Sequence, residues 1–176
     1  MKLCLNKNYK LERLKETDDL SSFFCGVKSL DDCIHTDFWQ HVRENKASVL
    51  GIKSNDKLIA IFSIGLNNLV LDRDDVEDVN MLRKESDQIT VNSDGNVVVK
   101  SLEIYFLAVN VEFQRKGIGS VIIDTITDFV EKKYKEIRFI SLDALNSAVE
   151  FYVKNEFNRA ELPIPNNPTI RMYKVL

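Results

Sequence analysis

The sequence predicts an α/β protein built on a single mixed sheet flanked by helices. Strand-like and helix-like segments follow one another in the order β-α-β-β-α-β-α-β-α-β, which suits one sheet with helices packed against it. The 176 residues are 44% hydrophobic and 29% charged, which suits one globular domain over residues 1–176. The most strand-like segment, at 97–109, leads through a glycine-containing loop into an amphipathic helix.

The first half of the chain predicts a strand, a helix and a hairpin. Tyr9–Leu14 alternates as a strand. Ser29 can cap a helix whose apolar stripe consists of Leu30, Cys33, Ile34, Phe38 and Val42. Ala47–Lys53 and Leu58–Leu66 are strand-like, and Ser54–Lys57 between them has the composition of a hairpin turn.

The second half adds an insertion and the segments around the central strand. Asp72–Asp87 is acidic, with apolar residues at helical spacing, and predicts a short surface helix. Its carboxylates either only face solvent or help to select a cationic substrate. The remaining predicted elements are a strand at Val97–Val109, a helix after the loop, a strand at Ile137–Leu142, a helix at Asn146–Asn155 and a strand at Ile170–Val175.

Charge and hydropathy argue against two classes of protein, those that bind nucleic acid and those that span a membrane. The net charge is -3 and the pI about 5.5, which argues against a dedicated nucleic-acid-binding protein. No apolar run is long enough to span a bilayer, and Met1–Lys7 is too polar for a signal peptide. We therefore expect a cytoplasmic protein without a membrane partner.

The cysteines predict neither disulfides nor a metal site. Cys4, Cys25 and Cys33 are odd in number and have no paired spacing, so we expect reduced thiols. Cys25 and Cys33 with His35 and His41 match no common zinc spacing, so buried thiols are the preferred interpretation.

The loop Gln114–Ser120 is a candidate phosphate-binding site. A helix N-terminus presents unpaired N–H groups and the positive end of the helix dipole to an anion. A P-loop requires Gly-Lys-Ser/Thr, whereas Gly119 is followed by Ser120 here, and Ile122 replaces the third glycine of the dinucleotide motif. The inward face of the helix that follows consists of Ile118, Val121, Ile122, Ile126, Phe129 and Val130.

The loop resembles the acyl-CoA pyrophosphate loop of the GNAT superfamily of N-acetyltransferases, Gln/Arg-x-x-Gly-x-Gly/Ala, in the run Gln114-Arg115-Lys116-Gly117-Ile118-Gly119. The segment Leu102–Val109 is similar to the central strand of that family, and Asn146–Phe157 to its Asn-x-x-Ala-x-x-Phe-Tyr-x-Lys-x-Gly-Phe block. Two positions depart from the pattern. Asn146 is one residue closer to the alanine, and Glu156 replaces a glycine of left-handed conformation, which implies a different or strained helix cap.

The resemblance implies an acetyl-CoA-dependent N-acetyltransferase with the mostly antiparallel mixed sheet of the GNAT fold. The acetyl group would pass to a primary amine by direct attack in a ternary complex, since no motif supplies a nucleophile. A backbone N–H near the end of the central strand would stabilise the oxyanion. The residues implied in acetyl-CoA binding are Leu107, Ala108, Val109, Gln114, Arg115, Lys116, Gly117, Ile118, Gly119, Ser120 and Asn146.

Two residues are candidates for the chemistry. The family counterpart of Tyr152 often protonates the departing thiolate, and a phenol with an ordinary pKa near 10 keeps its proton at neutral pH. Glu103 stands near the position at which the histone acetyltransferase branch carries a general-base glutamate. Each also has a structural interpretation, because Tyr152 could pack beside Phe151 and Glu103 could be only a polar strand residue.

More than one amine is a candidate acceptor of the acetyl group. Phe23, Cys25, Gly26 and Leu30 resemble the opening of a bacterial subgroup that includes toxins acetylating aminoacyl-tRNA, although a packed first helix explains the same residues. Those members usually carry an arginine where this chain has Phe106, and they tend to be basic. Charged tRNA is therefore the alternative to a small-molecule or peptide amine, and a CoA-binding domain without turnover is the third candidate. A homodimer would be ordinary for the fold.

Overall fold

The structure is a computed structural model that describes residues 9–72, 89–160 and 168–176. Contacts divide the chain into two compact units, Met1–Gly65 with Ile104–Asp128, and Leu66–Glu103 with Phe129–Leu176. The surface helix predicted at 72–87 lies, from residue 73 on, outside the described residues.

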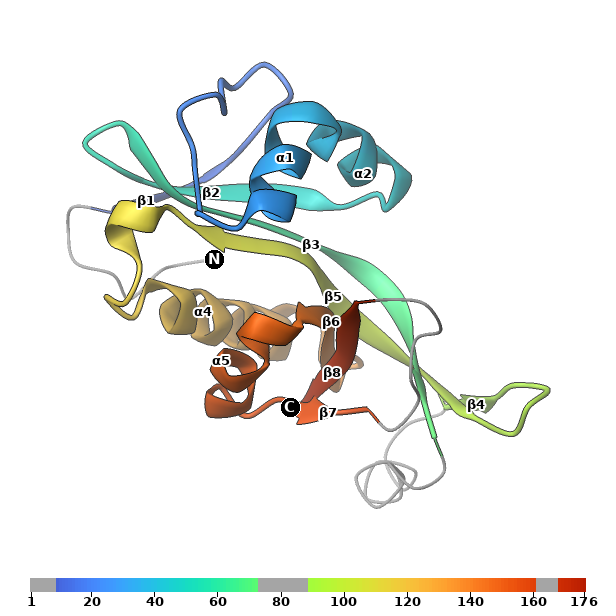
Figure 1. The fold of residues 1–176 in the computed structure, drawn as a ribbon. Helices are drawn as coiled ribbons and strands as arrows, with labels where there is room; N and C mark the ends of the chain where they lie inside the picture. The colour runs from blue at the N-terminus through green and yellow to red at the C-terminus, as the bar shows by residue number, and fades with distance from the viewer. Residues whose placement is uncertain (1–8, 73–88, 161–167) are drawn as a thin grey trace. The chain divides into compact units, whose positions relative to one another are not determined.

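The first unit combines strand segments with short helices (Figure 1). Its elements are β1 (Tyr9–Arg13), α1 (Lys28–Thr36), α2 (Phe38–Glu44), β2 (Ser48–Ser54), the first part of β3 (Lys57–Leu71), the end of β5 (Val97–Val109), η1 (Val111–Phe113) and the start of α4 (Ile118–Lys133). β2 pairs antiparallel with β1 and β3, and the hairpin turn uses Asn55 and Asp56 at positive φ, as expected for a two-residue loop. In the core, the rings of Phe38 and Phe106 lie edge to face with centroids 5.2 Å apart.

The single helix predicted across residues 29–42 is two helices, so that prediction is wrong in its continuity. α1 ends at Thr36, and Asp37 has φ -124° and ψ 7° before α2 begins. The Thr36 hydroxyl donates to the backbone oxygen of Asp32 at 2.8 Å and to the Asp37 carboxylate at 3.1 Å. Local bonds from short polar side chains compete with helix continuation, which accounts for the break.

The start of α1 also differs from the prediction. The helix already begins at Lys28, so Ser29 lies in its first turn and does not cap it. The carboxylate of Asp31 instead accepts hydrogen bonds from the backbone N–H groups of Cys25 and Gly26, at 2.7 and 3.0 Å. An acidic side chain in the first turn is favourable with the helix dipole, and here it also holds the preceding turn.

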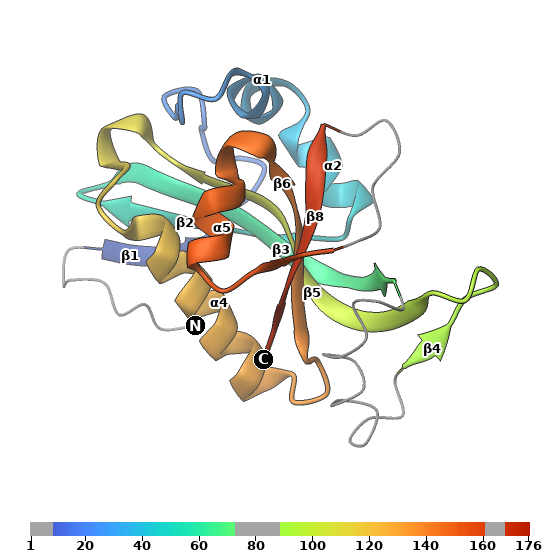
Figure 2. The same cartoon turned by 60° about the horizontal axis from the view of Figure 1, so that its bottom comes forward.

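The second unit combines the remaining parts of β3, β5 and α4 with the C-terminal elements (Figure 2). The additional elements are β4 (Thr90–Val91), β6 (Phe139–Leu145), η2 (Asn146–Ala148), α5 (Val149–Lys154), β7 (Asn158–Arg159) and β8 (Thr169–Val175). β6 and β8 pair antiparallel, with Asp143 opposite Arg171. β4 and β7 were not predicted, because two-residue strands are too short to show alternation.

The C-terminal end of α5 has the unusual cap that the sequence implied. Glu156 adopts φ 68°, and the N–H of Phe157 donates to the carbonyl of Tyr152 at 3.1 Å. A left-handed residue is normally glycine at this point. The Lys174 ammonium lies 2.9 Å from the Glu156 carboxylate, an interaction that a glycine could not make.

Across both units the strand order is β1-β2-β3-β5-β6-β8-β7, with β4 paired to β5. The predicted α/β class with a mixed sheet flanked by helices is therefore confirmed. Within the described segments, no helix is both long and apolar enough to cross a membrane.

Two cysteines lie in the described part of the chain as reduced thiols. Cys25 is buried, as predicted, and Cys33 is half-buried. Burial raises the pKa of each thiol to about 11, and the nearby carboxylate of Asp37 adds to the effect at Cys33.

Alkylation of Cys25 and Cys33 by iodoacetamide at pH 8 is expected to be about 100-fold slower in the folded than in the denatured protein. The thiolate is the reactive form, and raising the pKa from 9.0 to about 11 lowers its fraction at pH 8 accordingly. The folded-state rate should rise about tenfold per pH unit below pH 11. Mass spectrometry of the two peptides measures the rates, and equal rates in both states would contradict the prediction.

Candidate active site

The loop before α4 has the backbone that a phosphate-binding turn requires. Arg115 and Gly117 adopt left-handed conformations with φ 59° and 77°. The Val121 N–H donates to the Gly117 carbonyl at 3.1 Å and closes the first helical turn. The N–H groups of that first turn have no acceptor one turn earlier in the helix, so they are available to an anion. A Cβ on Gly117 would meet no atom within 4 Å, so the space beside it is open.

Gln114 anchors this loop to the rest of the first unit. Its side-chain Nε2 donates to the carbonyl of Cys25 at 2.7 Å and to that of Val109 at 3.0 Å. The amide therefore ties the loop both to the turn before α1 and to the end of β5. This contact favours a structural role for Gln114 beside the binding role that the motif predicts.

Positive charge gathers around the same loop. The Lys116 ammonium donates to the carbonyl of Glu112 at 3.0 Å and lies 5.0 Å from the centroid of the Phe113 ring. Lys57 lies 5.6 Å from the same ring and pairs with the Glu112 carboxylate. Arg115 is exposed. One carboxylate accompanies three cations here, which suits an anionic ligand.

The end of β5 alternates between buried and accessible residues. Ala108 is buried, whereas Leu107 and Val109 on either side are partly exposed. The strand stops at Asn110, whose N–H donates to the carbonyl of Ile59 at 2.9 Å and whose Oδ1 caps η1. The binding roles predicted for these residues are backbone roles, and they stay predictions.

In the second unit, Tyr152 has its ring in the core. It is 8% exposed, and its ring lies edge to face with those of Phe151 and Phe157, at centroid distances of 5.0 and 5.6 Å. Desolvation by burial raises the pKa of Tyr152 well above its ordinary value, so the phenol stays protonated at neutral pH. Among the described residues its hydroxyl has no hydrogen-bond partner. Both the packing and the acid interpretation are therefore compatible with its surroundings.

Glu103 lies at the centre of a polar network in the second unit. It is 4% exposed, and its Oε1 accepts a hydrogen bond from Arg171 Nη1 at 2.5 Å. Its Oε2 accepts from Asn67 Nδ2 at 3.0 Å and from the Ser141 hydroxyl at 3.2 Å. Arg171 also donates to Asp143 Oδ1 at 3.1 Å. A buried carboxylate is tolerated when it is paired and hydrogen-bonded in this way.

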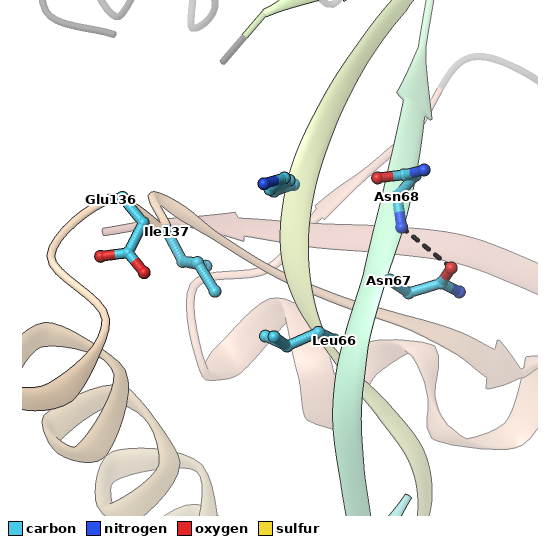
Figure 3. Close-up of a pocket in the computed structure, with 6 residues that line it drawn as sticks. Leu66, Asn67, Asn68, Glu136 and Ile137 are labelled. Atoms are coloured by element: carbon cyan, nitrogen blue, oxygen red, sulfur yellow. Dashed lines mark hydrogen bonds between the residues drawn. The ribbon is translucent and has the colours of Figure 1, made fainter. Parts of the chain in front are cut away.

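Asn67 links this network to a pocket of about 290 Å³ (Figure 3). The N–H of Asn68 donates to Asn67 Oδ1 at 2.9 Å, which leaves the amide nitrogen to face Glu103. The pocket is lined by Leu66, Asn67, Asn68, Lys100, Glu136 and Ile137.

Asn146 is exposed and is the first residue of η2. It is not a helix N-cap, because the N-cap position is Leu145 and makes no side-chain cap. Its amide Nδ2 donates to the carbonyl of Pro168 at 3.3 Å and so connects η2 to the start of β8. Its predicted contact with the cofactor stays a prediction.

One further group of possible metal ligands exists in the first unit. Cys33, Asp37 and His41 place ligand atoms within 4.8 Å of one another, with His41 Nε2 3.3 Å from the Asp37 carboxylate. This set shares only Cys33 and His41 with the residues considered from the sequence. The expectation of a metal-free protein stays a prediction.

The sequence-predicted residues fall into two groups. Val109 and Gln114 are hydrogen-bonded in the first unit, whereas Glu103, Asn146 and Tyr152 of the second unit share no hydrogen bond with one another. Sequence reasoning missed the partners of Glu103. A usable signal was the pair of polar residues two apart in two apolar strands, namely Ser101 with Glu103 and Ser141 with Asp143.

Comparison with known proteins gives one family match and many structural ones. A family model described as an acetyltransferase (GNAT) domain matches residues 77–170. Comparison with curated proteins finds no match.

Three solved structures illustrate the structural likeness. AtaT complexed with acetyl-methionyl-tRNAfMet is 17% identical over 93% of this chain and 93% of its own, with TM-score 0.66. AtaTR bound with acetyl-CoA is 18% identical over 93% and 92%, with TM-score 0.63. A mutant of KacT is 15% identical over 94% of both chains, with TM-score 0.63. At these identities the likeness shows a shared fold.

Proposed function

Because this chain belongs to the GNAT family of acetyltransferases and is an acetyl-CoA-dependent N-acetyltransferase, we propose that it transfers the acetyl group to a primary amine by direct attack in a ternary complex. The observation that carries this proposal is the glycine loop at the N-terminus of α4, with its two left-handed residues and its surrounding cations. The pyrophosphate of acetyl-CoA would accept hydrogen bonds from the first-turn N–H groups of α4. Arg115 and Lys116 would add positive charge at the pyrophosphate. Leu107–Val109 would pair with the pantetheine arm, and Asn146 would hydrogen-bond an amide of that arm.

The cysteines support direct transfer over a covalent route. A ping-pong mechanism requires a thiolate or another activated nucleophile. Cys25 is 4% exposed, and its pKa is raised to about 11 by burial, so it is neither accessible nor ionised at neutral pH. The nearby carboxylate of Asp31 raises the pKa of the Cys25 thiol further, which disfavours the thiolate.

Most steps of the proposed reaction have a candidate group in this chain. An ammonium acceptor first loses a proton, and its nitrogen lone pair then attacks the thioester carbonyl carbon. A backbone N–H near Val109 would stabilise the resulting oxyanion. The carbon–sulfur bond breaks, and Tyr152 gives its proton to the thiolate of CoA and regains one from the acceptor nitrogen. Glu103 would contribute its buried negative charge on the acceptor side.

Replacing Gly117 with alanine is expected to weaken acetyl-CoA binding about tenfold or more, because a left-handed alanine costs about 1–2 kcal/mol and the first-turn N–H groups would shift. Titration calorimetry measures the affinity. Gly95→Ala is the matched control, since Gly95 has φ 83° in a turn of the second unit. Equal affinities for the two variants would contradict the role of the loop.

A second acceptor, aminoacyl-tRNA, has specific support. AtaT, which resembles this chain along almost its whole length, was solved with acetyl-methionyl-tRNAfMet. The residues Phe23, Cys25, Gly26 and Leu30 also resemble the toxin subgroup. Against this acceptor stand Phe106, which is buried against Phe38 where the toxins usually have arginine, and the net charge of -3.

A thiol-release assay tests both acceptors. Acetyl-CoA is supplied with spermidine, with a lysine-containing peptide or with methionyl-tRNA, and release of CoA thiol is followed. Turnover of spermidine or the peptide supports the small-amine proposal, whereas turnover of methionyl-tRNA alone supports the alternative. Binding of acetyl-CoA without release in any case would favour a CoA-binding domain without turnover.

A further inference from the structure

The contacts of Glu103 leave little room for direct proton transfer. Its side chain is 6% exposed, and both of its oxygens accept hydrogen bonds from neighbouring side chains, Oε1 from Arg171 and Oε2 from Asn67 and Ser141. A general base must lie within hydrogen-bond reach of the proton that it takes. Because Glu103 is buried, an acceptor amine has little access to its oxygens, and displacing one of these donors would leave the buried charge with one partner fewer, which is costly.

The same network offers a second carboxylate that is accessible. Arg171 Nη1 donates to Asp143 Oδ1 at 3.1 Å, and the Asp143 side chain is 36% exposed against 16% for Arg171. One guanidinium therefore neutralises two carboxylates only in part, and the uncompensated negative charge is exposed at Asp143. An ammonium group is attracted to such a charge.

Asp143 is close in the sequence to Asn146, the residue of the second unit that is proposed to bind the cofactor. Asp143 lies in β6, three residues before Asn146, which is the first residue of η2. The register of β6 and β8 sets Asp143 directly opposite Arg171, so the pairing of the two strands holds the charge pair in position. The carboxylate is thus carried by a strand and not by a loop, which suits a catalytic group.

We propose that Asp143, and not Glu103, takes the proton from the acceptor ammonium, and that Glu103 and Arg171 are positioning residues for it. This assignment rests on the proposed function. The N–H proton moves to a carboxylate oxygen of Asp143, the nitrogen lone pair attacks the thioester carbon, and the neutral carboxyl later returns its proton to solvent. The charged groups facing Asp143 are Arg171 from β8 and Glu103 from β5.

The electrostatics of Asp143 agree with this role. Desolvation raises the pKa of its carboxyl above the ordinary value, an effect that Arg171 opposes and the charge of Glu103 reinforces. A carboxylate whose proton affinity is increased is a better general base near neutral pH.

The test compares Asp143→Asn with Glu103→Gln in the thiol-release assay, using whichever of spermidine, the lysine peptide and methionyl-tRNA the wild type acetylates fastest. Asp143→Asn is expected to lower kcat about 100-fold with the KM for acetyl-CoA unchanged. Its rate should rise with pH across the neutral range, where the wild type is level, because the amine must then lose its proton to solvent. Asp143→Glu should recover part of the rate. Glu131→Gln, the same chemical change at an exposed position of α4, should leave kcat unchanged.

The outcomes separate the two proposals. If the wild type acetylates none of the three amines, the proposed function fails and the assignment fails with it. If the wild type is active and Asp143→Asn keeps its rate and pH profile, the assignment alone is overturned. It is also overturned if the pH profile changes in Glu103→Gln and not in Asp143→Asn, which would return the base to Glu103. Urea denaturation of each variant distinguishes a change in chemistry from a loss of folded protein.

Discussion

Tyr152→Phe is expected to lower the release of CoA thiol about 100- to 10,000-fold, the usual range for loss of a general acid. The substitution removes only the hydroxyl, so the ring contacts with Phe151 and Phe157 remain and the fold should be unchanged. Because burial raises the pKa of Tyr152, the wild-type phenol carries a proton at every pH at which the assay is run. The affinity for acetyl-CoA should be the same in both proteins, which calorimetry measures.

A second tyrosine provides the control. Tyr134 is half-buried in the same unit, and its ring lies edge to face with Phe129 at 5.6 Å. Tyr134→Phe removes a hydroxyl from a similar aromatic contact and should leave thiol release unchanged. If Tyr152→Phe releases thiol at the wild-type rate, Tyr152 is a packing residue and the acid must be sought elsewhere.

Arg171→Leu is expected to lower the free energy of unfolding by about 3–5 kcal/mol, because it leaves the buried carboxylate of Glu103 without its counter-charge. The effect should appear as a lower urea midpoint. The double variant Arg171→Leu with Glu103→Leu should recover much of the loss, since removing both charges also removes the cost of burying one alone.

An exposed ion pair in the same unit sets the scale for this result. Arg159 lies 3.4 Å from Glu150, and their side chains are 56% and 77% exposed. Arg159→Leu should change the free energy of unfolding by about 1 kcal/mol or less, because solvent screens the pair. Equal losses for Arg159→Leu and Arg171→Leu would show that the Glu103 network is not held together by its charges.

The predictable features of this protein were those that depend on neighbours in the chain. The strand at 97–109, the hairpin turn at Asn55 and Asp56, and the left-handed residue in place of a glycine at Glu156 all follow from local backbone requirements. Local patterns predicted less well which of several nearby groups a polar side chain hydrogen-bonds. Asp31, and not Ser29, organises the start of α1, because the turn before the helix supplies N–H groups that a carboxylate can reach.

The candidate site divides in the same way. By itself the sequence determined the glycine loop, the helix that follows it and the position of Tyr152, since each is a run of adjacent residues whose spacing carries the information. Only the tertiary structure shows that Glu103 is a buried carboxylate paired with an arginine. Its partner Arg171 lies 68 positions away, and the two meet because strand pairing brings β8 beside β6, an arrangement that depends on the burial of whole strands and not on any local pattern.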